Sequence, residues 1–396
     1  MSSVEEKLPD GWVETTLGEI ANITMGQSPK SEFYNFEGNG IPFYQGVTEF
    51  NDKYVSIKKF TSKSTKVVPE NTILFSVRAP VGRVNFTNNK CCIGRGNAGL
   101  YMKNNNQDFL YYLLIFLERM LQDYSSGTVF TSISGNELNI IPVLIPKDKK
   151  EQKAIANVLT AFDDKIENLR AQNQTLEQTA QTIFKEWFGK YQISDELPEG
   201  WRVGKLGDIA FNHSKSFKFT EEDVVFVNTG DVSEGQFLHA NKVSPIGLPG
   251  QAKKAIELYD ILYSEIRPKN KRFAFVDFDT SNYVVSTKFM IIRPKDDFSA
   301  HILYLLLKNQ NTVNEFNVIA ESRSGTFPQI TFDSISDFPV IIPTKEFQNQ
   351  FKKILRPLME KERINHQQIQ TLTKTRDALL PKLMRGEIRA IGFNTN

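Results

Sequence analysis

Two glycine-rich stretches of the sequence have the spacing of nucleotide-binding loops. Phe36-Glu-Gly-Asn-Gly40 matches an F-x-G-x-G pattern that cradles S-adenosylmethionine, and Gly94-Arg-Gly-Asn-Ala-Gly99 matches the dinucleotide pattern G-x-G-x-x-G. In such sites a helix begins directly after the glycines, so that its backbone N–H groups face the ligand. Here Ile-Pro-Phe-Tyr follows Gly40 and Leu-Tyr-Met-Lys-Asn follows Gly99, and neither run opens a helix. We therefore expect both stretches to be turns.

Other catalytic motifs are missing from the sequence. It has no P-loop lysine motif and no Asp/Asn-Pro-Pro-aromatic tetrapeptide that would accept a flipped amino group. Glu151 and Lys153 match part of a nuclease motif, but Asp148 comes too close before them and all three lie at the expected start of a helix. The four histidines lack the spacing of metal ligands: His213, His239, His301 and His366. The sequence predicts no catalytic residue, no metal and no cofactor.

Composition indicates an ordinary soluble protein. The 396 residues are 40% hydrophobic and 24% charged, which suits two or three domains. No apolar run approaches the roughly 20 residues that span a bilayer, and the N-terminus lacks the layout of a signal peptide. We expect a cytoplasmic protein with no membrane contact. The adjacent Cys91 and Cys92 are expected to be reduced thiols in or near a strand.

Basic residues concentrate in two blocks, although the net charge is only +2. Residues 41–103 contain ten Lys or Arg against three acidic residues, and residues 242–295 contain ten against five. The blocks are either two surfaces for an anionic partner or solvated faces of ordinary domains.

The sequence contains an internal repeat. Leu8-Pro-Asp-Gly-Trp12 followed by Leu17-Gly-Glu-Ile-Ala21 returns 189 residues later, as Leu197-Pro-Glu-Gly-Trp201 and Leu206-Gly-Asp-Ile-Ala210. Ser-Gly-Thr at 126–128 returns at 324–326, and Ile-Pro-Val-Leu-Ile-Pro at 141–146 returns as Phe-Pro-Val-Ile-Ile-Pro at 338–343. Such repetition indicates two copies of one structural unit.

A long helix is predicted to follow the first copy, at 148–190. Asp148 is the expected N-cap, with Glu151 completing a capping box. An apolar seam recurs at alternating spacings of four and three residues: Ile155, Leu159, Phe162, Ile166, Leu169, Asn173, Leu176, Ala180, Ile183 and Trp187. A helix about 50–60 Å long with one apolar seam needs a partner helix. Asn173, a polar position in the seam, is the candidate that fixes the register.

The partner is predicted in the second copy, at 344–386. Gln152 matches Gln348, and Gln-Thr-Leu at 174–176 matches 370–372. Pro357 is expected to divide this helix into a piece ending near Leu355 and a longer piece from Leu358 to Met384. The matching seam positions are Leu355, Leu358, Ile369, Leu372 and Leu379, while Asn365 and Arg376 stand where the first copy has Leu169 and Ala180.

We expect an α+β fold with two repeated strand-rich globular domains, separated by two long antiparallel coiled-coil helices. Strands are predicted at 41–46, 72–77 and 82–86, and buried helices at 108–122 and 300–309. The expected boundaries are 1–147, 148–190, 191–343 and 344–396.

The repeated motifs and the long helix after each copy occur twice in the same order. In this arrangement the sequence resembles the specificity subunit of type I restriction-modification enzymes. The C-terminal Thr-Arg-Asp-Ala-Leu-Leu-Pro-Lys-Leu-Met-Arg-Gly-Glu-Ile at 375–388 is similar to that family's closing segment. The resemblance implies that each globular domain is a target recognition domain for one half of a split sequence in double-stranded DNA, and that the helix pair sets the gap. It also implies two methyltransferase subunits that carry S-adenosylmethionine and modify adenine, and motor-nuclease subunits that cleave.

Under this interpretation, Lys and Arg contact phosphates while Arg, Lys, Asn and Gln read base edges. The DNA-binding candidates are Tyr44, Gln45, Lys58, Arg78, Arg83 and Arg95 in the first domain and Asn228, Arg267, Lys269, Lys271 and Arg272 in the second. Thr128 and Thr326 belong to Ser-Gly-Thr loops that either bind phosphate or are plain turns. Two alternatives remain open: a self-contained methyltransferase or nuclease, and a coiled-coil adaptor without a DNA role.

Overall fold

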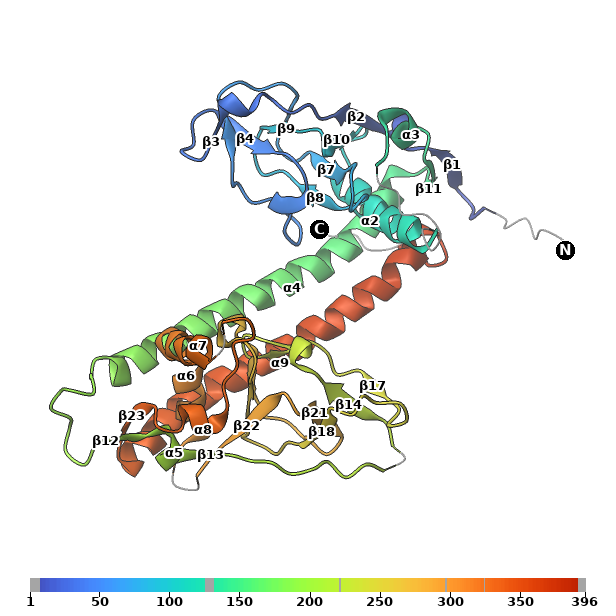
Figure 1. The fold of residues 1–396 in the computed structure, drawn as a ribbon. Helices are drawn as coiled ribbons and strands as arrows, with labels where there is room; N and C mark the ends of the chain where they lie inside the picture. Colours follow the sequence, from blue (N-terminus) through green and yellow to red (C-terminus); the bar gives the residue numbers. More distant parts are fainter. Residues whose placement is uncertain (1–7, 125–131, 221, 296–297, 324, 391–396) are drawn as a thin grey trace. The chain divides into compact units, whose positions relative to one another are not determined.

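The computed structural model describes residues 8–124, 132–220, 222–295, 298–323 and 325–390 (Figure 1). It divides into two compact units, which we call unit 1 (residues up to Leu169, together with those from Gln367 onward) and unit 2 (Arg170–His366). The division crosses two long helices, α4 (Lys149–Phe184) and α9 (Lys345–Met384). Each unit therefore contains part of both helices. The predicted α+β class, with strand-rich globular parts and two long helices, is confirmed.

Unit 1 is built around three sheets. The first pairs β1 (Trp12–Thr16) with β11 (Pro142–Pro146). The second is four-stranded, in the order β2 (Ala21–Met25), β10 (Asn97–Met102), β7 (Ile73–Ser76) and β8 (Val84–Phe86). The third is five-stranded, in the order β3 (Tyr34–Asn35), β5 (Phe60–Thr61), β4 (Ile41–Tyr44), β9 (Cys91–Ile93) and β6 (Val67–Val68). The helices of this globular part are α1 (Leu17–Ile20), α2 (Gln107–Tyr124) and α3 (Gly135–Asn139).

Unit 2 repeats this order. Strand β12 (Arg202–Lys205) pairs with β23 (Pro339–Ile342). One four-stranded sheet has the order β13 (Ala210–Asn212), β22 (Phe289–Pro294), β19 (Ile261–Ser264) and β20 (Phe273–Phe275). The other has the order β17 (Lys242–Val243), β14 (Val224–Val227), β21 (Tyr283–Ser286) and β18 (Ala252–Ala255), and β15 (Val232–Ser233) pairs with β16 (Gln236–Phe237). The helices are α5 (Leu206–Ile209), α6 (Ala300–Lys308), α7 (Gln310–Arg323) and α8 (Phe332–Ile335).

The repeat extends to strand pairing. In unit 1 the parallel pair is β4 with β9, and in unit 2 it is β14 with β21. The hairpin of β7 and β8 corresponds in the same way to the hairpin of β19 and β20. The two copies of the sequence therefore share these strand pairings, although the third sheet of unit 1 has five strands and its counterpart in unit 2 has four. The predicted strands and buried helices lie where they were expected.

Both long helices contribute to the core of each unit. In unit 1, Ile155 and Leu159 of α4 share a hydrophobic cluster with Leu380 and Leu383 of α9 and the apolar face of α2. In unit 2, Phe184 of α4 shares a cluster with Phe351 and Leu355 of α9 and with α6. Because the N-terminal part of α4 meets the C-terminal part of α9, and the reverse holds in unit 2, the helices pair antiparallel.

A glutamine joins the start of each long helix to the strand before it. Gln152 donates to the carbonyl of Pro146 (2.8 Å) and accepts from the side chain of Asn104 (2.9 Å). Gln348 donates to the carbonyl of Pro343 (3.1 Å) and accepts from the backbone N–H of Ser299 (2.9 Å). Both glutamines are buried, so each helix begins at a fixed place relative to its sheet.

Two expectations about the helices were wrong. Helix α9 is continuous through Pro357, because Leu355 and Leu358, before and after the proline, pack into one core cluster that holds the helix together. At the start of α4, Asp148 does cap the helix by accepting from the N–H of Lys150 (2.9 Å). Glu151, however, binds Arg389 through both carboxylate oxygens (2.6 and 2.8 Å), so its carboxylate serves that ion pair instead of the predicted capping box.

Candidate nucleic-acid interface

The glycines of the two nucleotide-like stretches serve close backbone packing. Within the second stretch, the N–H of Gly96 donates to the carbonyl of Gln45 (3.1 Å), and the carbonyl of Asn97 accepts from the N–H of Gly26, a glycine outside both stretches (2.9 Å). A Cβ on Gly26 or Gly96 would collide with a neighbouring carbonyl oxygen, as would one on Gly40. Strand β4 follows Gly40, and β10 begins at Asn97 inside the second stretch, so the prediction that neither stretch opens a helix is confirmed. The expectation that the whole second stretch is a turn was wrong, because Asn97–Gly99 belong to β10.

This glycine packing brings Gln45, Arg78 and Arg95 onto adjacent backbone in unit 1. Gly96 contacts Gln45 as described and also accepts from the N–H of Val77 (2.9 Å), the residue before Arg78. The side chains of Gln45, Arg78 and Arg95 are exposed. We call these three residues the unit 1 cluster. It combines two guanidinium groups with one amide, the groups that bind phosphates and read base edges.

Other candidates in unit 1 have structural partners. Lys58 donates to the carbonyl of Thr48 (2.5 Å) and so holds the 3₁₀ turn Val47–Glu49 that follows β4. Arg83 is exposed and lies 3.5 Å from Glu118. Tyr44 is fully buried, and burial raises the pKa of its hydroxyl, because β4 has neighbouring strands on both sides. Tyr44 is therefore a core residue and not a DNA contact. Thr128 lies outside the described residues.

In unit 2 the candidates gather around the loop between β19 and β20. Arg267 and Lys271 flank the 3₁₀ turn Pro268–Asn270 and both have positive φ (46° and 50°). Lys269 lies 3.7 Å from Glu321, and Lys271 lies 3.8 Å from Glu234. These are distant, largely exposed ion pairs of little strength. The loop occupies the place of the β7–β8 loop of unit 1, which carries Arg78 and Arg83.

A second turn lies against this loop. Asn228 caps the 3₁₀ turn Thr229–Asp231 by accepting from the N–H of Thr229 (2.8 Å). Arg272 donates to the carbonyl of Thr229 (2.6 Å). Asn228 and Arg272 therefore hold one turn together, while Arg267 remains exposed. Thr326 is exposed too, two residues before Pro328, whose carbonyl accepts from the N–H of Arg267 (3.0 Å).

Sequence reasoning missed His239, which was considered only as a metal ligand. Its Nε2 lies 3.3 Å from Oδ2 of Asp231, so it supports the turn of unit 2 as Lys58 supports the turn of unit 1. Nothing in the local sequence indicates this pairing, because seven residues, which include the β15–β16 hairpin, separate Asp231 from His239.

All of the residues predicted for the helix pair are buried or half-buried. Those that are buried are Ile155, Leu159, Ile166, Leu169, Asn173 and Leu355. Those that are half-buried are Phe162, Leu176, Ile183, Leu358, Ile369, Leu372 and Leu379.

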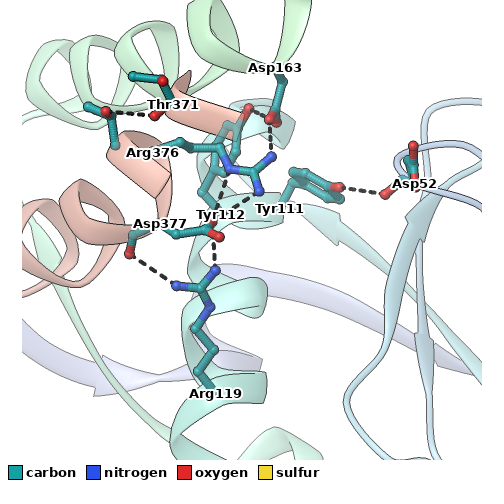
Figure 2. Close-up of polar contacts among 9 residues, drawn as sticks. Asp52, Tyr111, Tyr112, Arg119, Asp163, Thr371, Arg376 and Asp377 are labelled. Carbon is teal, nitrogen blue, oxygen red and sulfur yellow. Dashed lines mark hydrogen bonds and ion pairs between the residues drawn. The ribbon is translucent and has the colours of Figure 1, made fainter. Parts of the chain in front are cut away.

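A polar network ties α9 to α4 and α2 in unit 1. Figure 2 shows Arg376 of α9 between two carboxylates: it donates to Asp163 of α4 (2.5 Å) and to Asp377 (3.0 Å). Tyr112 of α2 donates to Asp163 (2.6 Å), and Arg119 of α2 donates to Asp377 (2.8 Å). Burial, followed by the charge of Asp163, raises the pKa of Tyr112. The network fixes α2, α4 and α9 relative to one another within unit 1.

In the described part of the chain, no three His, Cys, Asp or Glu side chains gather as metal ligands. None of the described helices is long and apolar enough to cross a membrane. Cys91 and Cys92 are free and buried in β9, as predicted.

Comparison with known proteins gives the family. A family model described as "Type I restriction modification DNA specificity domain" matches residues 9–178 and 198–374. The chain belongs to this family. The two matched segments follow the two copies of the sequence repeat, so the chain contains two specificity domains. The role of this family is DNA specificity and not catalysis, which decides against a self-contained methyltransferase or nuclease and against an adaptor without a DNA role.

Two of the similar proteins are named specificity subunits of type I restriction enzymes. The specificity subunit of the type I restriction enzyme HindI from Haemophilus influenzae is 52% identical over 181 residues, covering 45% of this chain and 39% of that one. The MjaIX specificity subunit from Methanocaldococcus jannaschii is 28% identical over 418 residues, covering 97% of this chain and 95% of that one. The HindI match therefore spans less than half of either protein, whereas the MjaIX match spans nearly all of both.

A solved structure shares the fold. The S subunit of a type I restriction-modification system from M. genitalium aligns with a TM-score of 0.66 at 18% sequence identity, covering 96% of this chain and 98% of that one. Specificity subunits of type I systems bind DNA and assemble with other subunits. A role in DNA specificity is consistent with a chain that carries no cofactor of its own.

Proposed function

We propose that unit 1 and unit 2 each read one half of a bipartite DNA target, with α4 and α9 setting the gap between the halves. One observation carries this proposal: the central strand pairings occur twice, and in both copies an arginine-bearing loop joins equivalent strands, β7–β8 in unit 1 and β19–β20 in unit 2. A duplicated recognition element suits a target made of two separate half-sites.

We further propose the roles of individual residues. Arg78 and Arg95, with Gln45, contact DNA in unit 1, and Arg83 and Lys58 lie at the margin of that surface. In unit 2 the exposed Arg267 and Thr326 make the matching contacts, with Lys269 and Lys271 beside them. Asn228 and Arg272 set the turn Thr229–Asp231, and Asn228 presents the remaining groups of its amide to a base.

The catalytic steps belong to partners in this proposal. Two methyltransferase subunits dock on the helix pair in the cytoplasm, bind S-adenosylmethionine and methylate adenine, and motor-nuclease subunits join for cleavage. The chain itself supplies a recognition surface and a docking surface. The chain incubated alone with DNA and labelled S-adenosylmethionine is expected to transfer no methyl group.

A domain exchange tests the assignment of half-sites. Residues 22–147 are replaced by the corresponding block of a relative with a different target, and the hybrid is co-expressed with its partner methyltransferase. A genome-wide map of methylated adenines should then show one half-site changed and the other retained. The matched control exchanges residues 211–338, which should change the other half only. A hybrid in which both halves change would contradict the proposal.

The role of the helix pair has its own test. Inserting seven residues into α4 and seven at the paired level of α9 lengthens both helices by about 10 Å, close to three base pairs. The mapped target should keep both half-sites and gain about three base pairs between them. Insertion in one helix alone should disrupt the seam and abolish methylation. An unchanged gap after the double insertion would exclude the helix pair as the spacer.

A further inference from the structure

Unit 2 has an open pocket beside the turn Thr229–Asp231, with a volume of about 490 Å³. The residues that line it form a polar wall and an apolar wall. The polar lining includes Asp231, His239 and Asn241, and the apolar lining includes Phe226, Ile246 and Leu248. The sequence interpretation assigned no role to these residues.

The apolar wall of this pocket is displayed to solvent. Ile246 is 89% exposed, and Val243, which also lines the pocket, is 41% exposed. Ile246 stands between Pro245 and Gly247, and Gly247 has φ +87°, a conformation that suits glycine. A single exposed aliphatic residue is ordinary, but two in the wall of one pocket point to a contact surface.

The polar wall joins the pocket to the recognition turn. Asp231 accepts from the N–H of Asn228 (2.9 Å) and lies 3.3 Å from Nε2 of His239, while Nδ1 of His239 accepts from the N–H of Asn241 (3.4 Å). Arg272, the residue before β20, donates to the carbonyl of Thr229 in the same turn. The pocket is therefore continuous with the surface that carries Asn228.

We propose that this pocket receives the C5-methyl edge of a thymine in the half-site read by unit 2. The inference rests on the proposed function, and it specifies the kind of base that unit 2 reads at this position. The carboxylate of Asp231 would repel a phosphate, so a base edge fits this pocket better than the DNA backbone. Thymine is the base that shows an apolar group in the major groove, and aliphatic side chains contact that methyl. A half-site with a methylatable adenine contains at least one thymine, opposite that adenine.

The test removes the methyl from the DNA and the aliphatic side chain from the protein. The full chain, co-purified with its methyltransferase subunits, is titrated with duplexes in which each thymidine of the mapped target is replaced singly by deoxyuridine. We expect one position in the unit 2 half-site at which uracil weakens binding about fourfold, the effect of one buried methyl group. Ile246→Ala should weaken binding to the thymine duplex to a similar degree, with no added loss on the uracil duplex.

Controls separate this contact from a general effect on folding or on the proposed function. Val318→Ala removes another aliphatic side chain of unit 2 that is 60% exposed, on α7, and should retain the full sensitivity to uracil. The inference is overturned if every uracil duplex of that half-site binds like thymine, or if Ile246→Ala keeps the uracil effect. In either case the half-sites would still be read, whereas failure of the proposed function would appear as loss of half-site preference in the wild-type complex.

Discussion

The side-chain amide of Asn365 on α9 donates a hydrogen bond of 2.8 Å to the side-chain oxygen of Asn173 on α4, inside the apolar seam of unit 2. Asn365 is fully buried and Asn173 is 6% exposed. Asn173 also donates to the carbonyl of Glu362 (3.3 Å). A paired polar side chain in a seam favours one register over its neighbours, because any slip leaves two amides buried without partners.

Asn365→Leu should therefore lower the free energy of unfolding by about 1–3 kcal/mol, since Asn173 then loses its buried partner. Adding Asn173→Leu should recover most of that loss, because two leucines suit an apolar seam. Urea denaturation of both single variants and the double variant measures the coupling. Additive losses would show that the two amides do not act as a pair.

The network around Arg376 gives a second prediction. Arg376→Met leaves the carboxylate of Asp163, whose side chain is 14% exposed, without its cation. We expect a loss of about 2–4 kcal/mol in unit 1, somewhat below the cost of breaking a fully buried pair. Arg119→Met is the matched control: it breaks an ion pair whose side chains are 40% and 36% exposed, worth about 1 kcal/mol or less. Equal losses in both variants would contradict the assigned difference in burial.

Pro357 lies inside a continuous helix at an exposed position. Proline in a helix interior removes a backbone hydrogen bond and costs about 3 kcal/mol. Pro357→Ala is expected to raise the free energy of unfolding by about 1–3 kcal/mol, with the circular dichroism of the native state little changed. Arg356→Ala, at the adjacent exposed residue, should change stability by less than about 0.5 kcal/mol. A destabilised Pro357→Ala variant would show that the proline shapes α9.

His301 predicts how unit 2 responds to acid. Burial, and then the charges of Lys352 and Arg356, lower the pKa of His301 to about 4. The unfolded chain takes up this proton near pH 6.5, so the stability tied to neutral His301 is present above that pH and is lost as pH falls towards about 4. The total is about 3 kcal/mol. The difference in unfolding free energy between the wild type and His301→Phe should shrink by that amount between pH 7 and pH 4. A pH-independent difference would contradict the shift.

The repeat and the apolar seam could be predicted from the sequence, because both are periodic patterns of residues. Ile155 and Leu159 follow the heptad spacing, and they lie in the unit 1 core. The strands of the two sheets followed from short apolar runs between turn residues, as at Ile73–Ser76. The duplication strengthened each predicted strand and helix, since the same pattern had to fit both copies of the sequence.

Contacts between distant side chains could not be predicted in this way. Asn365 looked like a defect in the second seam, and only the antiparallel register shows that it meets Asn173. Tyr44 ends a strand next to a polar residue, which suggested an exposed position, but two neighbouring strands cover it. Arg272 was grouped with exposed cations, whereas it donates to a carbonyl 43 residues away in sequence. In each case a long-range neighbour decides the environment of the side chain.

The division into units also bears on synthesis at the ribosome. Unit 2 is one continuous segment, whereas unit 1 needs Leu380, Leu383, Met384 and Ala390 to complete its core. The first part of the chain to be translated is therefore finished last. Until the C-terminal end emerges, the apolar faces of α2 and the start of α4 remain uncovered, which makes a truncated or stalled chain a target for chaperones and proteases.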